Sequence, residues 1–413
     1  MPPYPGYPLD PPFRSRFQAR YVDPVGALIG LAEAPVQGQG ATLATGNGLY
    51  EAMKTLILST QLAAEARGAQ EGGSISASVL KPFPQTALMK LSKLLETFPV
   101  SCDNPPKSPP LSPTQLARLV LTLHPALIYT PFQTWAILSE QCEELGLGAL
   151  GSPVRSELDD LSTGGEDGSG LLGYRLVRVE RVGSKERTIT ITFASPAASP
   201  GEVRVDVPGG PGGLLPFPFA SADLDFVPTS RFVSLLTTFL QAHALGWDMS
   251  LVPPAHPSTA SCSSSTLVRV FADVLGYIKG STGDALSHFG TVYMYKEMGG
   301  REIVMRREVV RSSEGQQERA LGTNSVTVWK PSTVVQSAWD GRVVCLEGVD
   351  VVGATAGAIA RLCTDREVEV WEGQRIVGQI ATGKEVRNTI LFFCLSEPPD
   401  SIRTSRLHTP RSE

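Results

Sequence analysis

The sequence lacks several patterns that would assign it at once to a functional class. Its six cysteines form no Cys-x-x-Cys pair, which argues against a zinc ribbon or a disulfide framework and fits an intracellular, reducing compartment. No hydrophobic run is long enough to cross a bilayer, so we expect no transmembrane segment. The formal net charge is −5 at pH 7, whereas a general nucleic-acid-binding protein is usually basic.

The 413 residues are instead rich in proline (33) and glycine (40), which divide the chain into stretches of different character. Residues 21–150 contain successive patterns of apolar residues at helical spacing. Ser112 followed by Pro113 predicts the capped start of one helix. Thr130 and Gly146 predict the start and the end of the next. We therefore expect this region to be helical.

Residues 151–226 begin with an acidic, glycine-rich linker. Alternating apolar and polar residues on both sides of a turn at Gly183 then predict a β-hairpin, followed by a third short strand. Residues 227–400 alternate short strands with helices, which is an α/β pattern, and residues 401–413 read as a disordered tail. Helices are expected at 230–244, 266–276, 333–339 and 355–363, and strands at 249–252, 290–295, 342–347, 367–371 and 389–395. Two of these strands are continuous apolar runs, which is typical of buried parallel strands.

A strand, a serine-rich loop and an apolar helix follow one another from residue 249 to residue 276. This order is typical of a phosphate-binding loop, in which glycine N–H groups and a lysine hold the phosphates. Ser265 or Thr266 would supply the hydroxyl that binds Mg²⁺. The positions of the two glycines and the lysine then hold serine: Ser258, Ser263 and Ser264. The alternative is an ordinary serine-rich loop that never bound a phosphate.

A second pattern is the apolar run that ends at Glu347, with Asp350 just beyond it. A strand that ends in a carboxylate suits a position beside a phosphate loop, where the acid lies near Mg²⁺. Hydrolytic sites of this kind usually carry a second acid at the next position, which here is Gly348. The alternative is a strand that ends in a turn and leaves Glu347 in solvent.

A third pattern is a proline-rich turn that carries Arg14 and Arg16. A planar guanidinium group on a rigid turn suits the stabilisation of charge on the γ-phosphate of a neighbouring site. The alternative is a basic turn exposed to solvent.

Together these motifs resemble the dynein-related AAA+ ATPases, in particular those that also carry a von Willebrand factor A domain. The runs that carry the resemblance are LDPPFRSRFQARYV, LKPFPQTALMKLSKLLETFP, VYMYKEMGGREIVMRREVV, GRVVCLEGVD and TILFFCLSEPP. The resemblance implies that residues 1–20 end a first AAA large subdomain and that residues 21–150 are its helical lid. It further implies that residues 227–400 form a second AAA module with a P-loop NTPase-like parallel sheet. We therefore expect a segment of a larger protein.

The same resemblance implies a function. The parent protein would bind and hydrolyse ATP with Mg²⁺, assemble its AAA modules into a ring, remodel a protein partner and reside in mitochondria. Arg16, with Arg14 beside it, matches the arginine finger that acts in trans. Glu347 matches the Walker B acid, usually an aspartate, and Glu347 with Ser265 would bind Mg²⁺. Because the Walker A loop lacks its glycines and lysine, we expect a degenerate second site, and the alternative is a non-catalytic pseudo-ATPase scaffold.

Overall fold

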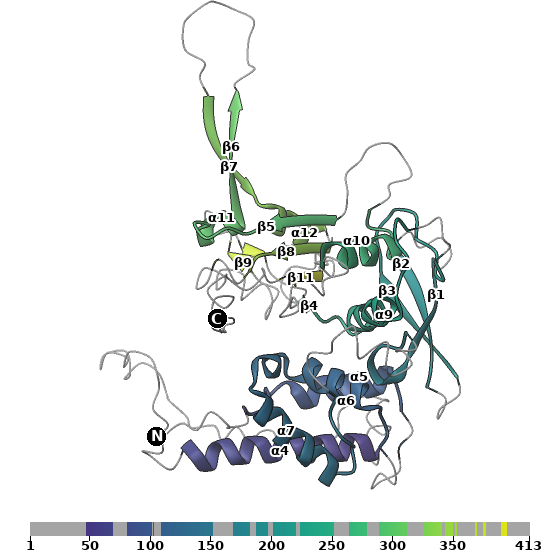
Figure 1. Ribbon diagram of the computed structural model, residues 1–413. Helices are drawn as coiled ribbons and strands as arrows, with labels where there is room; N and C mark the ends of the chain where they lie inside the picture. The colour runs from purple at the N-terminus through teal and green to yellow at the C-terminus, as the bar shows by residue number, and fades with distance from the viewer. Residues whose placement is uncertain are drawn as a thin grey trace, which may run out of the picture. The chain divides into compact units, whose positions relative to one another are not determined.

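The structure is a computed structural model of a mixed α/β chain (Figure 1). It describes residues 47–68, 81–100, 102, 109–151, 168–181, 187–196, 201–219, 224–251, 264–278, 289–311, 325–340, 343–349, 352, 368–369, 375–376 and 390–394. The chain forms two compact units, and membership of the units alternates along the sequence. The first unit comprises residues 1–155, 169–175 and 194–203, and the second comprises 156–168, 176–193 and 204–413.

The first unit is built from helices, as the sequence predicts. These are α4 (Gly48–Gly68), α5 (Ala87–Thr97), α6 (Pro113–Leu123) and α7 (Phe132–Glu144), with the 3-10 helices η1 (Pro125–Tyr129) and η2 (Leu171–Gly173). The apolar stripes of α5 and α6 form buried faces made of Leu88, Leu91, Leu94, Leu95, Leu116, Leu119, Val120 and Leu123. On α4 the buried face is made of Leu49, Met53, Leu56 and Ile57, whereas Leu62 is 51% exposed.

The predicted start of α6 is confirmed. Ser112 Oγ accepts a hydrogen bond from the N–H of Gln115 (3.3 Å), and the Gln115 side chain accepts one from the N–H of Ser112 (3.1 Å). This reciprocal pair satisfies two N–H groups that a helix start leaves free.

The start of α7 differs from the prediction, while its end agrees. Thr130 does not cap α7, because its hydroxyl donates to the carbonyl of Leu127 at 2.6 Å and Pro131 holds the cap position. The preceding η1 presents that carbonyl to the hydroxyl, which is why the cap prediction fails. Gly146 ends the helix in a left-handed conformation (φ 75°), as predicted.

The predicted hairpin and third strand of the linker region are also confirmed. They form a three-stranded sheet in the order β1 (Arg175–Arg181), β2 (Thr188–Ala194), β3 (Glu202–Pro208). Alternate residues of β2, Ile189, Ile191 and Phe193, are buried. Gly183 lies outside the described residues.

The second unit also contains a four-stranded parallel sheet. Its order is β4 (Met249–Leu251), β11 (Ile390–Cys394), β8 (Val343–Glu347), β5 (Phe289–Tyr293). The prediction that the apolar runs are parallel strands is confirmed, and Val343–Leu346 are all buried. The helices α9 (Ser230–Ala244), α10 (Ser264–Val274) and α12 (Thr333–Asp340) match predicted helices, whereas 355–363 lies outside the described residues. The short strands β9 (Val368–Glu369) and β10 (Arg375–Ile376) form a separate antiparallel pair.

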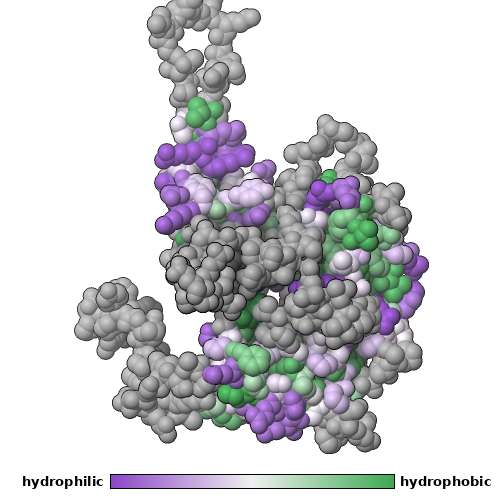
Figure 2. Space-filling view, viewed as in Figure 1, coloured by the Kyte–Doolittle hydropathy of each residue, from purple (hydrophilic) through white to green (hydrophobic). Residues whose placement is uncertain are grey.

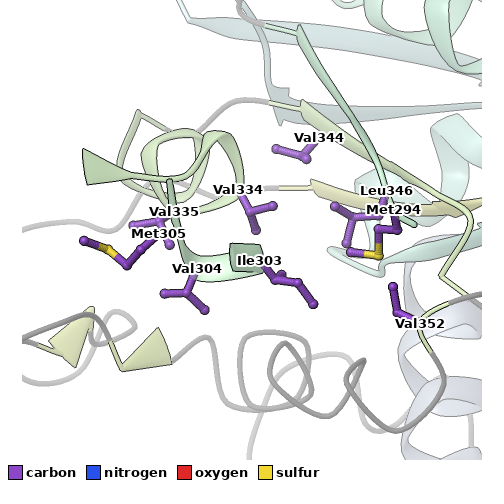
Figure 3. Close-up of a cluster of buried hydrophobic side chains, with 9 residues drawn as sticks. All are labelled: Met294, Ile303, Val304, Met305, Val334, Val335, Val344, Leu346 and Val352. Carbon is purple, nitrogen blue, oxygen red and sulfur yellow. The ribbon is translucent and has the colours of Figure 1, made fainter. Parts of the chain in front are cut away.

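One face of this sheet is covered by elements that the sequence analysis missed. These are α11 (Gly300–Val304), β6 (Met305–Arg311) and β7 (Ser325–Pro331). Together with α12 they bury a cluster made of Met294, Ile303, Val304, Met305, Val334, Val335, Val344, Leu346 and Val352 (Figure 3). Strands β6 and β7 pair antiparallel as a two-stranded ribbon that extends away from the parallel sheet (Figure 1). No helix in the described ranges is both long enough and apolar enough to cross a membrane.

Candidate functional site

The carboxyl ends of the four parallel strands lie level with one another. The strand pairing joins Leu251 to Cys394, Cys394 to Glu347, and Glu347 to Tyr293. Because neighbouring strands are about 4.8 Å apart, the Cα atoms of Leu251 and Glu347 lie about 10 Å apart, with only β11 between them. The serine-rich loop leaves β4 at this edge, and the candidate acid ends β8 at the same edge. The fold therefore places the end of β4, from which the serine-rich loop continues, at the same sheet edge as Glu347.

Glu347 stands where the chain turns away from the sheet. Its carbonyl accepts a hydrogen bond from the N–H of Met294 (2.8 Å), which ties β8 to the end of β5. Val344 and Leu346 face the buried cluster, so the alternation of a strand directs Glu347 to the opposite face. Gly348 follows with φ 80°, a conformation that favours glycine and turns the chain immediately. Glu347 is half-buried, and Asp350 lies outside the described residues.

The amino end of α10 carries hydroxyl groups and no cation. The helix begins at Ser264, the position aligned with the lysine of a phosphate loop, and continues through Ser265 and Thr266. Ser258 and Ser263 lie outside the described residues. The first cationic side chain of the helix is Arg269, which is exposed, with its Nη2 3.7 Å from a carboxylate oxygen of Asp225. The sequence has no lysine or arginine from residue 252 to residue 268, so it supplies none of the lysine charge that holds a triphosphate tightly.

The carboxyl end of α10 is held by the glycine-rich loop that follows β3. The N–H of Gly210 donates to the carbonyl of Leu275 (2.8 Å), and the N–H of Gly212 donates to that of Gly276 (2.8 Å). The N–H of Leu215 donates to the carbonyl of Asp273 at 3.0 Å. These bonds satisfy carbonyls that a helix end otherwise leaves without a partner.

This close approach explains why glycines are needed in the loop. A Cβ atom at Gly210 would lie 2.2 Å from the carbonyl oxygen of Gly276, a contact that no side chain tolerates. Arg181, at the end of β1, donates from Nη2 to the carbonyls of Gly210 (2.9 Å) and Gly212 (2.6 Å). The PGGPGG run of this loop is the kind of sequence signal that marks a close backbone approach, although it does not indicate which element the backbone approaches.

His243 fixes α9 against the same region. It is buried, its Nε2 lies 2.8 Å from the carbonyl oxygen of Pro208, and its ring meets Phe271 of α10 edge-on at 5.8 Å. Burial lowers the pKa of His243 to about 4, and the hydrogen bond to Pro208 opposes that shift in part. The side chain is therefore neutral at physiological pH, and Nε2 carries the proton that it donates.

The arginine-finger candidates and a metal site were also expected. Arg14 and Arg16 lie outside the described residues. Within the part of the chain that the structure describes, no three His, Cys, Asp or Glu side chains gather as metal ligands would.

Comparison with known proteins gives one informative similarity. No family in the protein-family scan matches the chain. The chain is 25% identical over 424 residues to the mouse von Willebrand factor A domain-containing protein 8. This similarity covers 97% of the chain but only 18% of the mouse protein, so the chain spans less than a fifth of its relative's length. The name of this relative records a von Willebrand factor A domain, which the proteins that the motifs resemble also carry.

Proposed function

We propose that the chain is a segment of a dynein-related AAA+ ATPase and that the level sheet edge at Leu251 and Glu347 is its second, degenerate nucleotide site. The observation that carries this proposal is the strand order. Along the chain the strands run β4, β5, β8, β11, whereas in the sheet they run β4, β11, β8, β5. The last strand is thus inserted beside the first. Open parallel sheets bind ligands at their carboxyl edge where the strand order reverses.

The elements at this edge support a phosphate ligand in particular. A loop leaves β4 at Leu251, and α10 begins at Ser264, so the partial positive charge of the helix start faces the end of that loop. Glu347 lies one strand away from β11 and two from β4. The spacing of about 10 Å leaves room for a phosphate and its Mg²⁺ ion between the loop and the acid. Ser265 and Glu347 are the proposed Mg²⁺ ligands.

The chemistry of the same residues supports weak binding. Ser264 stands in place of the lysine that would neutralise the β- and γ-phosphates, and Gly348 stands in place of a second acid. In this proposal ATP hydrolysis belongs to another module of the parent protein. Arg16, with Arg14 beside it, would act there in trans, and the ring would remodel a protein partner, in mitochondria if the resemblance extends to location.

A second candidate is a non-catalytic scaffold that keeps the shape of a nucleotide module without its ligand. The difference between the two ends of α10 favours this candidate. Backbone hydrogen bonds from the glycine-rich loop hold the carboxyl end, whereas the amino end has no lysine or arginine. In this case the sheet edge would present a surface and would not bind a nucleotide.

Binding of a fluorescent ATP analogue to the purified chain tests both candidates. We expect a dissociation constant above about 1 mM for the natural sequence. Ser263→Gly combined with Ser264→Lys should lower it at least tenfold in the presence of Mg²⁺, and adding Glu347→Gln should reverse the gain. Thr333→Lys, which adds the same charge at the exposed start of α12, is the matched control and should gain nothing.

The outcomes separate the candidates. An unchanged lack of affinity in the restored variant would favour the scaffold, because the pocket itself would then be missing. Tight, Mg²⁺-dependent binding by the natural sequence that Glu347→Gln abolishes would instead mean that the second site is competent, and the degenerate assignment would be wrong.

A further inference from the structure

The helix α7 is held firmly along its inner side and is open to solvent along its outer side. Trp135 and Leu138 are buried on the inner side. Trp135 Nε1 donates to the carbonyl of Gly151 (2.9 Å), and Ser139 Oγ accepts from the N–H of Leu150 (2.9 Å). These contacts fix the orientation of the helix, so the outer side presents its residues in a fixed arrangement.

The first half of this outer face is apolar. Phe132 is 81% exposed, Ile137 is 37% exposed, and Ala136 between them is also exposed. Figure 2 shows hydrophobic and hydrophilic residues side by side over the helices of the first unit. One exposed apolar side chain is ordinary, but a phenylalanine removed from water by a partner would contribute a large buried area.

The second half of the outer face is acidic. Glu140, Glu143 and Glu144 are exposed and occupy the last two turns of α7. The sequence has no lysine or arginine from residue 119 to residue 154. Among the residues that the structure describes, none forms an ion pair with these three carboxylates.

The position of these carboxylates opposes the stability of the helix. The carboxyl end of a helix carries partial negative charge, which disfavours carboxylates and favours cations. Glu140 also lies three residues before Glu143 and four before Glu144, and like charges at these spacings repel each other. A place where the sequence breaks a local rule without compensation in the fold is typical of a functional surface. Cations of a partner would supply the missing compensation.

The chemistry of the outer face restricts the class of partner. Carboxylates repel the phosphates of nucleic acids and of anionic lipids. Within the described ranges, no three acidic, histidine or cysteine side chains gather closely enough to hold a metal ion. An apolar half followed by an acidic half instead complements a helix that carries apolar residues and cations on one face.

We propose that the outer face of α7, from Phe132 to Glu144, docks a basic amphipathic helix of a protein partner. An apolar side chain of the partner packs on Phe132 and Ile137, and its lysine or arginine side chains pair with the carboxylates. This surface lies in the first unit and does not depend on the proposed nucleotide site.

The test uses the full chain and a fluorescein-labelled synthetic peptide of sixteen residues. The peptide is built on alanine, with leucines in one half and lysines in the other half of the same helical face. Fluorescence polarisation should show saturable binding that added salt weakens. Phe132→Ala should weaken binding about tenfold, and Glu140→Gln and Glu144→Gln about threefold each. Glu297→Gln removes the same charge from an exposed position of the second unit and should change affinity less than twofold.

Thermal melting of the same variants separates docking from a role in the fold. Glutamine relieves the repulsion at the end of α7, so Glu140→Gln and Glu144→Gln should raise the melting temperature while they weaken binding. A residue that serves only the fold would lose stability when it is replaced. The two readouts should therefore change in opposite directions.

Four results would overturn the proposal. The first is no saturable binding of the peptide up to about 1 mM. Equal losses of affinity for Glu144→Gln and Glu297→Gln would mean non-specific attraction between charges. A lower melting temperature of both glutamine variants of α7 would mean that the carboxylates support the fold. Saturable binding of Ca²⁺ that Glu144→Gln abolishes would mean that the acidic half is a cation site.

Discussion

The two ends of α10 have opposite characters. At its carboxyl end, the N–H groups of Gly210 and Gly212 donate to the last carbonyls, and Arg181 holds this loop by donating to the carbonyls of the same two glycines. At its amino end, Ser264 begins the helix where a phosphate site would have lysine. One end is thus supported by a precise backbone fit, and the other lacks the charge that a phosphate ligand requires.

This difference separates the requirements of the fold from those of the ligand. The glycine contacts are needed whether or not a nucleotide binds, because they position α10 against the rest of the second unit. A lysine at the amino end would contribute only when a phosphate is present. The following predictions test whether the two ends are as unequal as this comparison implies.

The largest effect is expected from Gly210→Ala. The added Cβ would meet the carbonyl oxygen of Gly276 at 2.2 Å, so the loop must leave the helix end. We expect a loss of about 3 kcal/mol in the free energy of unfolding, measured by urea denaturation. Gly213→Ala is the control, because a Cβ there meets no atom within 4 Å. Equal stability of the two variants would show that the loop does not support the helix.

The next effect is a dependence of stability on pH through His243. Its pKa is about 4 in the folded chain and near 6.5 when unfolded, so the unfolded state binds the proton first as pH falls. The stability that the folded state gains by keeping His243 neutral is fully present above pH 6.5 and is lost as pH falls towards 4. We expect the natural chain to lose about 2–3 kcal/mol more than His243→Gln between pH 7 and pH 4. If the free energy of unfolding of the two proteins changed equally with pH, the predicted role of His243 would be contradicted.

A smaller effect is expected from Arg181→Met. The change removes two charge-assisted hydrogen bonds to Gly210 and Gly212 and should cost about 2 kcal/mol of stability. Arg178→Met is the matched control on the same strand, because the side chains of Arg178 and its ion-pair partner Glu180 are each 49% exposed. That control should change stability by less than about 0.5 kcal/mol. If both variants lost the same amount, Arg181 would have no special role.

The smallest effect concerns the amino end of α10. A ligand that binds with a dissociation constant of 1 mM or weaker, present at 1 mM, stabilises the fold by at most about 0.4 kcal/mol. Mg²⁺ and ATP should therefore barely raise the melting temperature of the natural chain, whereas the Ser263→Gly/Ser264→Lys variant should show a clear rise. A shift of several degrees in the natural chain would mean that the two ends of α10 are both functional.

The sequence predicts elements well where local chemistry determines them. Ser112 and Pro113 predict the start of α6, and the apolar run before Glu347 predicts a buried parallel strand. It fails where a neighbouring element competes, as when η1 takes the hydroxyl of Thr130. Strand β6 was missed because Arg306, Arg307 and Glu308 are consecutive charges, so no alternation of apolar and polar residues reveals it. Strand β7 does alternate, from Ser325 to Val328, and this signal could have found it.

The candidate site shows the same division. The residue types and their order along the chain are visible in the sequence, so Glu347 and Ser264–Thr266 were found there. The shared sheet edge of Leu251 and Glu347 depends on the insertion of β11 between β4 and β8, which pairs β4 with residues more than 140 positions away. The contact of Gly210 with Gly276 likewise depends on the tertiary fold, and no local pattern specifies its partner.

The alternation of the two units along the chain has a practical consequence. Residues 169–175 and 194–203 belong to the first unit, although the stretch between them belongs to the second. Neither unit is therefore a continuous stretch of polypeptide, and no single truncation yields either one whole and without residues of the other. Expression of one unit alone would require its three stretches to be joined by two designed linkers.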